Sequence, residues 1–99
     1  AEGWTPLIIA SWLGRSAIVE LLLRKVADAN LANPKGTTPL MYAKDSFLRN
    51  SDPASLEHLL AYGADPSRRD MYDKTLLDYV ELNRRAAVQE IIELNGGTQ

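Results

Sequence analysis

The stretch GTTPL at residues 36–40 decides the fold, because a closely similar stretch, GWTPL, occupies residues 3–7. The two copies start 33 residues apart, and a weaker copy, DKTLL, starts 37 residues further on at residue 73. Threonine followed by proline is a typical helix start, since the hydroxyl accepts a free backbone N–H and proline lacks the donor that would stay unpaired. The spacing therefore predicts an internal repeat whose units each begin a helix at this threonine.

A second apolar segment follows each copy at a similar offset. The segment VELLL at residues 19–23 is matched by LEHLL at residues 56–60 and, more weakly, by QEIIE at residues 89–93. Each unit is therefore expected to contain a second helix that is rich in leucine and isoleucine.

Glycines and turn-forming residues mark the ends of these helices. Gly14 is expected to end the first helix, and Gly63 and Gly96 suit the left-handed conformation that ends the second helix of a unit. Asn, Pro, Gly and Asp are concentrated in residues 30–36 and 67–74, which favours tight turns there. The predicted unit is a helix, a turn, a second helix and an extended hairpin-like loop.

With this pattern the chain resembles the ankyrin repeat family over residues 3–97. The residues that carry the resemblance are Thr5-Pro6-Leu7, Ala10, Gly14, Leu21-Leu22-Leu23, Ala27-Asp28, Asn30 and Gly36, and then Thr38-Pro39-Leu40, Ala43, Leu59-Leu60 and Gly63-Ala64-Asp65. The resemblance implies one all-α domain over residues 1–99, a solenoid of helix-turn-helix units joined by hairpin-like loops. Its three repeats would cover residues 3–35, 36–72 and 73–97, the last as a C-terminal cap.

Two features depart from the family pattern. The histidine that usually follows Thr-Pro-Leu is replaced by Ile8, Met41 and Asp78, so its hydrogen bonds between loops cannot be carried over. Val26 stands where glycine is expected, and a β-branched residue is costly at positive φ. The first repeat is therefore expected either to end its second helix by another geometry or to lose some stability.

The resemblance implies a protein interaction module with no enzymatic activity, which binds its partner in the concave groove and at the hairpin tips. The family's contact positions correspond here to Trp4, Trp12, Leu13, Lys35, Thr37, Asp45, Ser46, Met71, Tyr72, Lys74, Leu82 and Asn83. Tryptophan, tyrosine and methionine in this set are enriched at the energetic centres of protein interfaces.

An alternative prediction comes from comparing the two ends of the repeat array. Val19 and Leu23, on one face of the second helix, correspond in the third repeat to Gln89 and Glu93, as expected for a polar cap. The first repeat has no such polar face. In the alternative, the chain is a structural or regulatory segment of a larger ankyrin protein, whose apolar N-terminal face packs on upstream repeats, a catalytic domain or a second copy, the last being self-association.

The stretch SFLRNSDPAS at residues 46–55 interrupts the repeat with four additional residues. Four residues are about one helical turn, so the register is kept if the first helix continues through Phe47 and Leu48. Asp52-Pro53 would then start the next helix, and a disordered loop is the alternative. Phe47, Leu48 and Arg49 are therefore secondary candidates for a binding site.

Composition argues against several other kinds of function. The chain has no cysteine, which excludes thiolate chemistry. Its formal net charge is -2, and a negative charge is the wrong sign for a protein that binds nucleic acid. The single histidine, His58, is expected to be partly buried and not catalytic, and the aspartates of the loops lack the pattern of a calcium site. We expect no cofactor, no metal, no nucleic acid and no membrane partner, and a cytoplasmic location.

Overall fold

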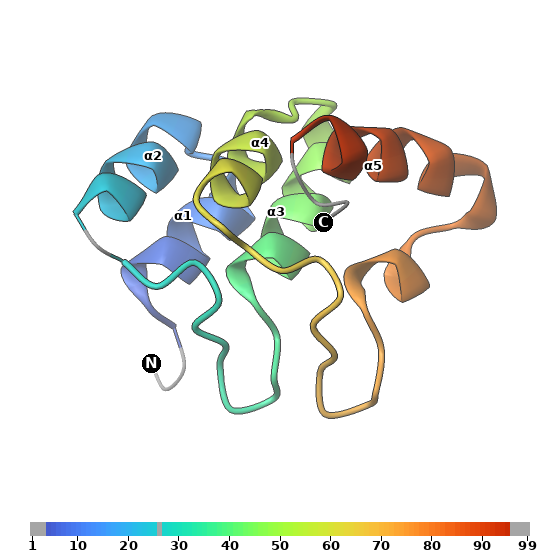
Figure 1. Cartoon of the computed structure of the whole chain (residues 1–99), viewed down its shortest axis with the longest axis horizontal. Coiled ribbons are helices and arrows are strands. Elements are labelled where there is room, and N and C mark those ends of the chain that lie inside the picture. The colour runs from blue at the N-terminus through green and yellow to red at the C-terminus, as the bar shows by residue number, and fades with distance from the viewer. Residues whose placement is uncertain (1–3, 26, 96–99) are drawn as a thin grey trace.

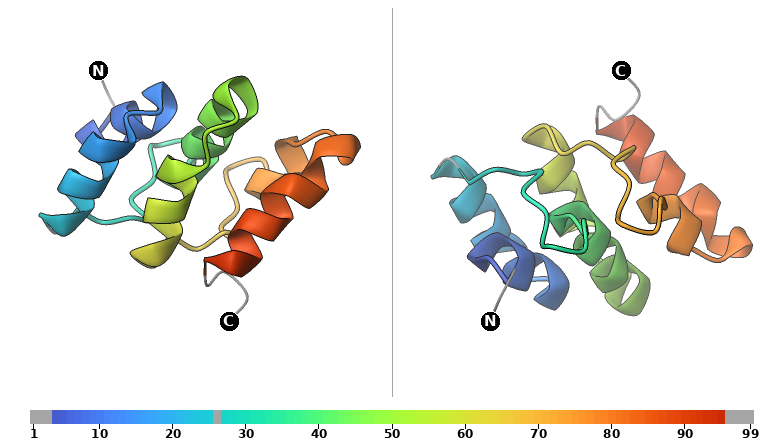
Figure 2. Two further views of the ribbon diagram at one scale, coloured as in Figure 1. Left: turned by 90° about the horizontal axis from the view of Figure 1, so that it is seen from above. Right: turned by 90° about the horizontal axis from the view of Figure 1, so that it is seen from below.

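The computed structural model describes residues 4–25 and 27–95, and all regular secondary structure in these residues is helical. The elements are α1 (Pro6–Leu13), α2 (Ser16–Arg24), α3 (Pro39–Asn50), α4 (Ala54–Ala61), the 3₁₀ helix η1 (Leu76–Tyr79) and α5 (Leu82–Leu94). They form three pairs, α1 with α2, α3 with α4 and η1 with α5, and the pairs stack side by side (Figures 1 and 2). The predicted all-α stack of helix pairs is confirmed.

The stack has two layers with the core between them. Helices α2, α4 and α5 form one layer, α1, α3 and η1 form the other, and the two long loops project beyond the second layer (Figure 1). Each pair is amphipathic and cannot bury its apolar face alone, so the core runs continuously through the stack. Its most deeply buried aliphatic side chains include Val19, Leu40, Leu56, Leu59, Leu76 and Val88.

The threonines cap the inner elements as the sequence predicts. The hydroxyl of Thr5 accepts the N–H of Ile8 at 3.1 Å, and the hydroxyl of Thr38 accepts the N–H of Met41 at 3.3 Å. In the third repeat a helix also follows Thr75, but it is a 3₁₀ helix of only 4 residues.

The short length of η1 follows from its two ends. The carboxylate of Asp78 reaches back to accept the backbone N–H of Thr75 at 2.9 Å, which closes a single tight turn. Val80 then leaves the helical region, with φ -103° and ψ 132°, and its side chain is buried in the core. The chain therefore turns inward after one turn and begins α5 at Leu82.

The predicted glycine positions are present at the ends of α1 and α4. Gly14 has φ 75° and Gly63 has φ 92°, both in the left-handed region that glycine adopts without steric cost. The predictions for Val26 and for Gly96 fall on residues outside those that the structure describes.

The additional residues after Asp45 lengthen the inner helix of the second repeat. Helix α3 has 12 residues where α1 has 8, and it continues through Phe47 and Leu48, whose side chains pack partly buried against the core. The carboxylate of Asp52 accepts the N–H of Ala54 at 3.0 Å, as expected of a helix start. Helix α4 begins at Ala54, one residue later than the sequence suggests.

The two projecting loops share one local structure and are linked to each other. The side chain of Asn33 accepts the N–H groups two and four residues ahead, at 2.9 and 3.0 Å, and Asp70 does the same at 2.9 and 3.1 Å. The N–H of Met71 donates to the carbonyl of Lys35 at 2.8 Å, which joins the tips. We call residues 33–37 the first hairpin and residues 70–74 the second hairpin.

A further link between the loops is made by Asn30. Its amide donates to the carbonyl of Gly63 at 3.1 Å, and its side-chain oxygen accepts the N–H of Asp65 at 2.8 Å. Both hydrogen bonds join the end of the first repeat to the end of the second. Among the described residues, no helix has the length and apolar character needed to cross a membrane.

Candidate functional site

Three aromatic side chains lie next to one another on the inner layer of the stack. The ring of Trp4 lies 5.9 Å from that of Trp12 and 5.4 Å from that of Tyr42, measured between centroids, and the rings are tilted. The hydroxyl of Tyr42 accepts a hydrogen bond from the side-chain amide of Asn33 at 3.1 Å, which fixes this ring to the first hairpin. We call Trp4, Trp12 and Tyr42 the aromatic row, and it passes from the first repeat to the second.

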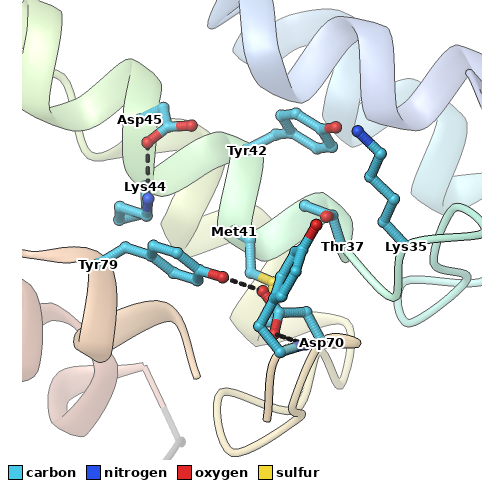
Figure 3. Close-up of a pocket in the computed structure, with 9 residues that line it drawn as sticks. Lys35, Thr37, Met41, Tyr42, Lys44, Asp45, Asp70 and Tyr79 are labelled. Carbon is cyan, nitrogen blue, oxygen red and sulfur yellow. Dashed lines mark hydrogen bonds and ion pairs between the residues drawn. The ribbon is translucent and has the colours of Figure 1, made fainter. Parts of the chain in front are cut away.

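A groove continues from the aromatic row between the hairpins and α3. It has a volume of about 270 Å³, and residues from both hairpins, α3 and η1 line it (Figure 3). Tyr42 belongs both to the aromatic row and to the groove. The lining residues are Lys35, Thr37, Met41, Tyr42, Lys44, Asp45, Asp70, Tyr72 and Tyr79.

Tyr79 and Asp70 line this groove and contact each other. The hydroxyl of Tyr79 donates to the carboxylate of Asp70 (Figure 3), and this bond raises the pKa of Tyr79 to about 12. The same bond holds the pKa of Asp70 below its usual value, with help from two backbone N–H groups of the second hairpin. At neutral pH Asp70 is therefore charged, and its carboxylate accepts hydrogen bonds from Tyr79 and from its own hairpin.

A second pair of opposite charges lies on α3. The ammonium of Lys44 is 2.6 Å from the carboxylate of Asp45, and the lysine side chain is only 7% exposed. The same ammonium lies 5.3 Å from the centre of the Tyr79 ring, and the ammonium of Lys74 lies 5.6 Å from that centre. A charge that is this deeply buried needs such partners, because desolvation without them costs several kcal/mol, on the order of the net stability of a domain.

The last turn of α3 reaches back to the end of α1. The guanidinium of Arg49 donates to the carbonyl of Trp12 and lies 5.8 Å from the centre of the indole ring. A cation at the C-terminal end of a helix interacts favourably with the unpaired carbonyl groups. The additional turn of α3 thus contacts a residue of the aromatic row.

Most predicted contact residues lie on the surface around these features. Lys35, Thr37, Asp45 and Tyr72 line the groove, and Met71 and Lys74 are exposed on the second hairpin. Trp4, Trp12 and Leu13, together with Ile9, line an apolar pocket of about 330 Å³ at the N-terminal end of the stack.

Three other predicted contact residues do not line the groove. Ser46 is 2% exposed and packs against Gly14, so it is part of the contact between the first two repeats and not of the outer surface. Leu82 and Asn83 are exposed but begin α5, in the outer layer, because η1 ends before it reaches the positions that lie within α1 and α3 in the other repeats. Of the secondary candidates, Phe47 and Leu48 are half-buried and Arg49 is exposed.

Two tyrosines of the groove, Tyr42 and Tyr79, are not among the residues predicted from the sequence. Both stand four residues after a capping threonine, at a position that Ile9 fills in the first repeat. A comparison of this position between repeats could have found them. Lys44 and Asp70 were not predicted either. Asp70 is hydrogen-bonded to Tyr79, and Lys44 lies between Asp45 and the ring of Tyr79, and these contacts depend on tertiary packing that no spacing in the sequence indicates.

A family model for ankyrin repeats (3 copies) matches residues 1–70. No curated protein matches the chain. In the part of the chain that the structure describes, no three histidine, aspartate or glutamate side chains gather into a group that could hold a metal ion.

Proposed function

The chain belongs to the ankyrin repeat family, and we propose that it binds a partner protein along the aromatic row, the groove and the hairpin tips. Ankyrin repeats are generally protein–protein interaction modules and are typically not catalytic. The general role follows from the family, whereas the surface used is the proposal.

The observation that supports this surface is that the aromatic row continues without a break into the groove. Trp4 and Trp12 are 39% and 42% exposed, and Tyr72 is 63% exposed. Large aromatic side chains that stay accessible in a folded domain are those on which binding energy is concentrated in interfaces. Trp4 lies against Trp12 and Tyr42, and Tyr42 lines the groove together with Tyr72, which gives a partner a contiguous apolar track with polar groups along its edge.

A comparative pull-down from a cell lysate tests this surface. Trp12→Ala and Tyr72→Ala are compared with the unchanged chain, and Tyr62→Ala is the matched control, since Tyr62 is an exposed tyrosine at the end of α4 and does not line the groove. Truncating a residue at the centre of an interface costs about 2 kcal/mol or more, which is roughly a thirtyfold loss of affinity. If both variants retain the same partners as the control, this surface is not the binding site.

A second candidate function is favoured by the outer face of the first repeat. Leu13 and Ile18 are 50% and 47% exposed, whereas the residues at the same positions of the second repeat, Ser46 and Ser55, are 2% and 3% exposed. The first repeat covers Ser46 and Ser55, and the equivalent face of the first repeat is both open and apolar. This face would suit a structural or regulatory role in which it packs on another repeat, a catalytic domain or a second copy of the chain.

The far end of the stack differs in a way that fits this second candidate. On α5 the side-chain amide of Gln89 donates to the carboxylate of Glu93 at 3.0 Å, so the face equivalent to the buried Val19 and Leu23 is polar. We propose that the third repeat caps the stack and that only the first repeat offers a stacking face.

Light scattering and tryptophan fluorescence test the self-associating form of this candidate. A dimer with blue-shifted tryptophan emission that becomes a monomer on Ile18→Asp supports it. A monomer with solvent-like emission at every concentration eliminates the second copy as the occupant of the face.

A further inference from the structure

The carboxylates of the groove are occupied by the protein itself. Asp70 accepts the hydroxyl of Tyr79 and two N–H groups of its own hairpin, and Asp45 is paired with Lys44 at 2.6 Å. A ligand that relied on either carboxylate would have to displace these donors. Both carboxylates that line the groove therefore already accept hydrogen bonds from within the protein.

The cations at the edge of the same surface remain accessible. Lys35 and Lys74 are exposed on the two hairpins, and neither makes an ion pair within residues 4–25 and 27–95. Arg49 is also exposed and uses one guanidinium nitrogen on the carbonyl of Trp12, which leaves several of its five donors for another acceptor. The surface presents positive charge although the chain has a formal net charge of -2.

Each of these cations lies beside an aromatic ring of the proposed surface. Arg49 is next to the ring of Trp12, and Lys74 is next to that of Tyr79. Lys35 lines the groove together with Tyr42, and Figure 3 shows its side chain extending toward the hydroxyl end of that ring. A ligand therefore meets an aromatic ring and positive charge together at each of these three places.

Resting on the proposed function, we propose that the partner contributes an acidic segment of polypeptide, with apolar or aromatic side chains between its carboxylates. The apolar side chains pack on the aromatic row, and the carboxylates pair with Lys35, Lys74 and Arg49. Neighbouring inner elements of such a stack lie about 8–10 Å apart, and an extended chain covers about 3.3 Å per residue. Carboxylates about three residues apart would reach both lysines.

Selection from a library of random peptides displayed on phage tests this inference with the complete chain as the target. Peptides that also bind the Trp12→Ala variant are removed, and the remaining peptides are sequenced and measured by fluorescence anisotropy. We expect them to be rich in Asp and Glu together with Leu, Phe or Trp, and to bind less tightly at 0.5 M salt than at about 0.15 M, because salt screens exposed charge pairs.

Charge variants provide the quantitative test. Lys35→Gln and Lys74→Gln should each weaken the selected peptides about two- to fivefold, the usual range for an exposed ion pair. Lys25→Gln, which removes an exposed lysine at the end of α2 that does not line the groove, should leave affinity unchanged. Circular dichroism of each variant confirms that the fold is retained.

Three outcomes would overturn the inference in different ways. Neutral or basic peptides that require Trp12 would refute the acidic partner and leave the proposed binding surface intact. Failure to select any peptide that requires Trp12 would count against the surface itself. Vesicles containing phosphatidylserine that bind in a Trp12-dependent manner, with no acidic peptide selected, would assign the surface to an anionic membrane instead of a protein.

Discussion

Replacing Gly36 by alanine should separate the two hairpins on which the proposed binding surface depends. Gly36 has φ 82°, and a Cβ atom there would lie 2.9 Å from the Cα of Asp70 and 3.1 Å from the backbone nitrogen of Met71. Both neighbours are backbone atoms, so no side-chain rotation relieves the contact. The left-handed conformation costs an alanine about 1 kcal/mol, and moving the hairpins apart loses the hydrogen bond between Met71 and Lys35, worth about 1 kcal/mol.

With the remaining overpacking, which costs about 1 kcal/mol, Gly36→Ala should lower the free energy of unfolding by about 3 kcal/mol. Asp73→Ala is the matched control, because Asp73 occupies the same position of the second hairpin with φ 63° and an 85% exposed side chain. Its backbone strain is already present, and its pair with Arg69 is exposed, so the loss should stay below about 1 kcal/mol. Urea denaturation followed by circular dichroism measures both. If Gly36→Ala costs no more than Asp73→Ala, the close approach of the hairpins does not contribute to stability.

Three further predictions concern buried and titrating groups. Ser11 has a buried hydroxyl with no hydrogen-bond partner among the described residues, so Ser11→Ala should leave the free energy of unfolding unchanged or raise it by up to about 1 kcal/mol; a clear loss would contradict this. Gly14→Ala should cost about 2 kcal/mol through backbone strain and displacement of the Ser46 hydroxyl, but only about 1 kcal/mol in the Ser46→Ala background; equal costs in urea titrations of both backgrounds would refute the contact. The pKa of Tyr79, raised to about 12 from 10.0 by its bond to Asp70, means that the folded state gains stability below about pH 10 and loses it as the pH rises to about 12. Ultraviolet titration of tyrosinate should show Asp70→Asn moving this pKa back toward 10.0, and an unmoved transition would show that the bond is absent. The pKa of Asp70 is lowered from its ordinary value of 3.8, so Asp70 stabilises the folded state above about pH 3.8, and this stability is lost as the pH falls below it.

Much of the fold could be predicted because its signals are local. A threonine before proline, a glycine after an apolar stretch and a count of residues between repeats gave the starts of α1 and α3, the end of α1 and the length of α3. The third repeat was predicted less well, since its threonine is followed by leucine. The helix after Thr75 stops after one turn because Val80 leaves the helical conformation and is buried in the core. This burial depends on packing with other elements and not on the local sequence.

The proposed binding surface was less predictable for a related reason. Contact positions late in the inner element were transferred at a constant distance from the capping threonine, and neighbouring repeats differ around these positions. Ser46 stands at the position of Leu13 but is buried because the first repeat covers it at Gly14, and η1 ends before it reaches the position of Leu82, which lies in α5. Tyr42 and Tyr79 come earlier, four residues after their threonines and within α3 and η1, and both line the groove.

The rings of the surface are held in place by groups from other parts of the stack. Arg49, on the additional turn of α3, fixes the end of α1 beside Trp12, while Asn33 of the first hairpin holds Tyr42, and the hydroxyl of Tyr79 donates to a carboxylate of the second hairpin. A ligand that meets rings already fixed pays less conformational entropy on binding. Affinity should therefore depend on the packing between repeats as well as on the contact residues. The additional turn of α3, which interrupts the repeat in the sequence, therefore helps to position the ring of Trp12 through Arg49.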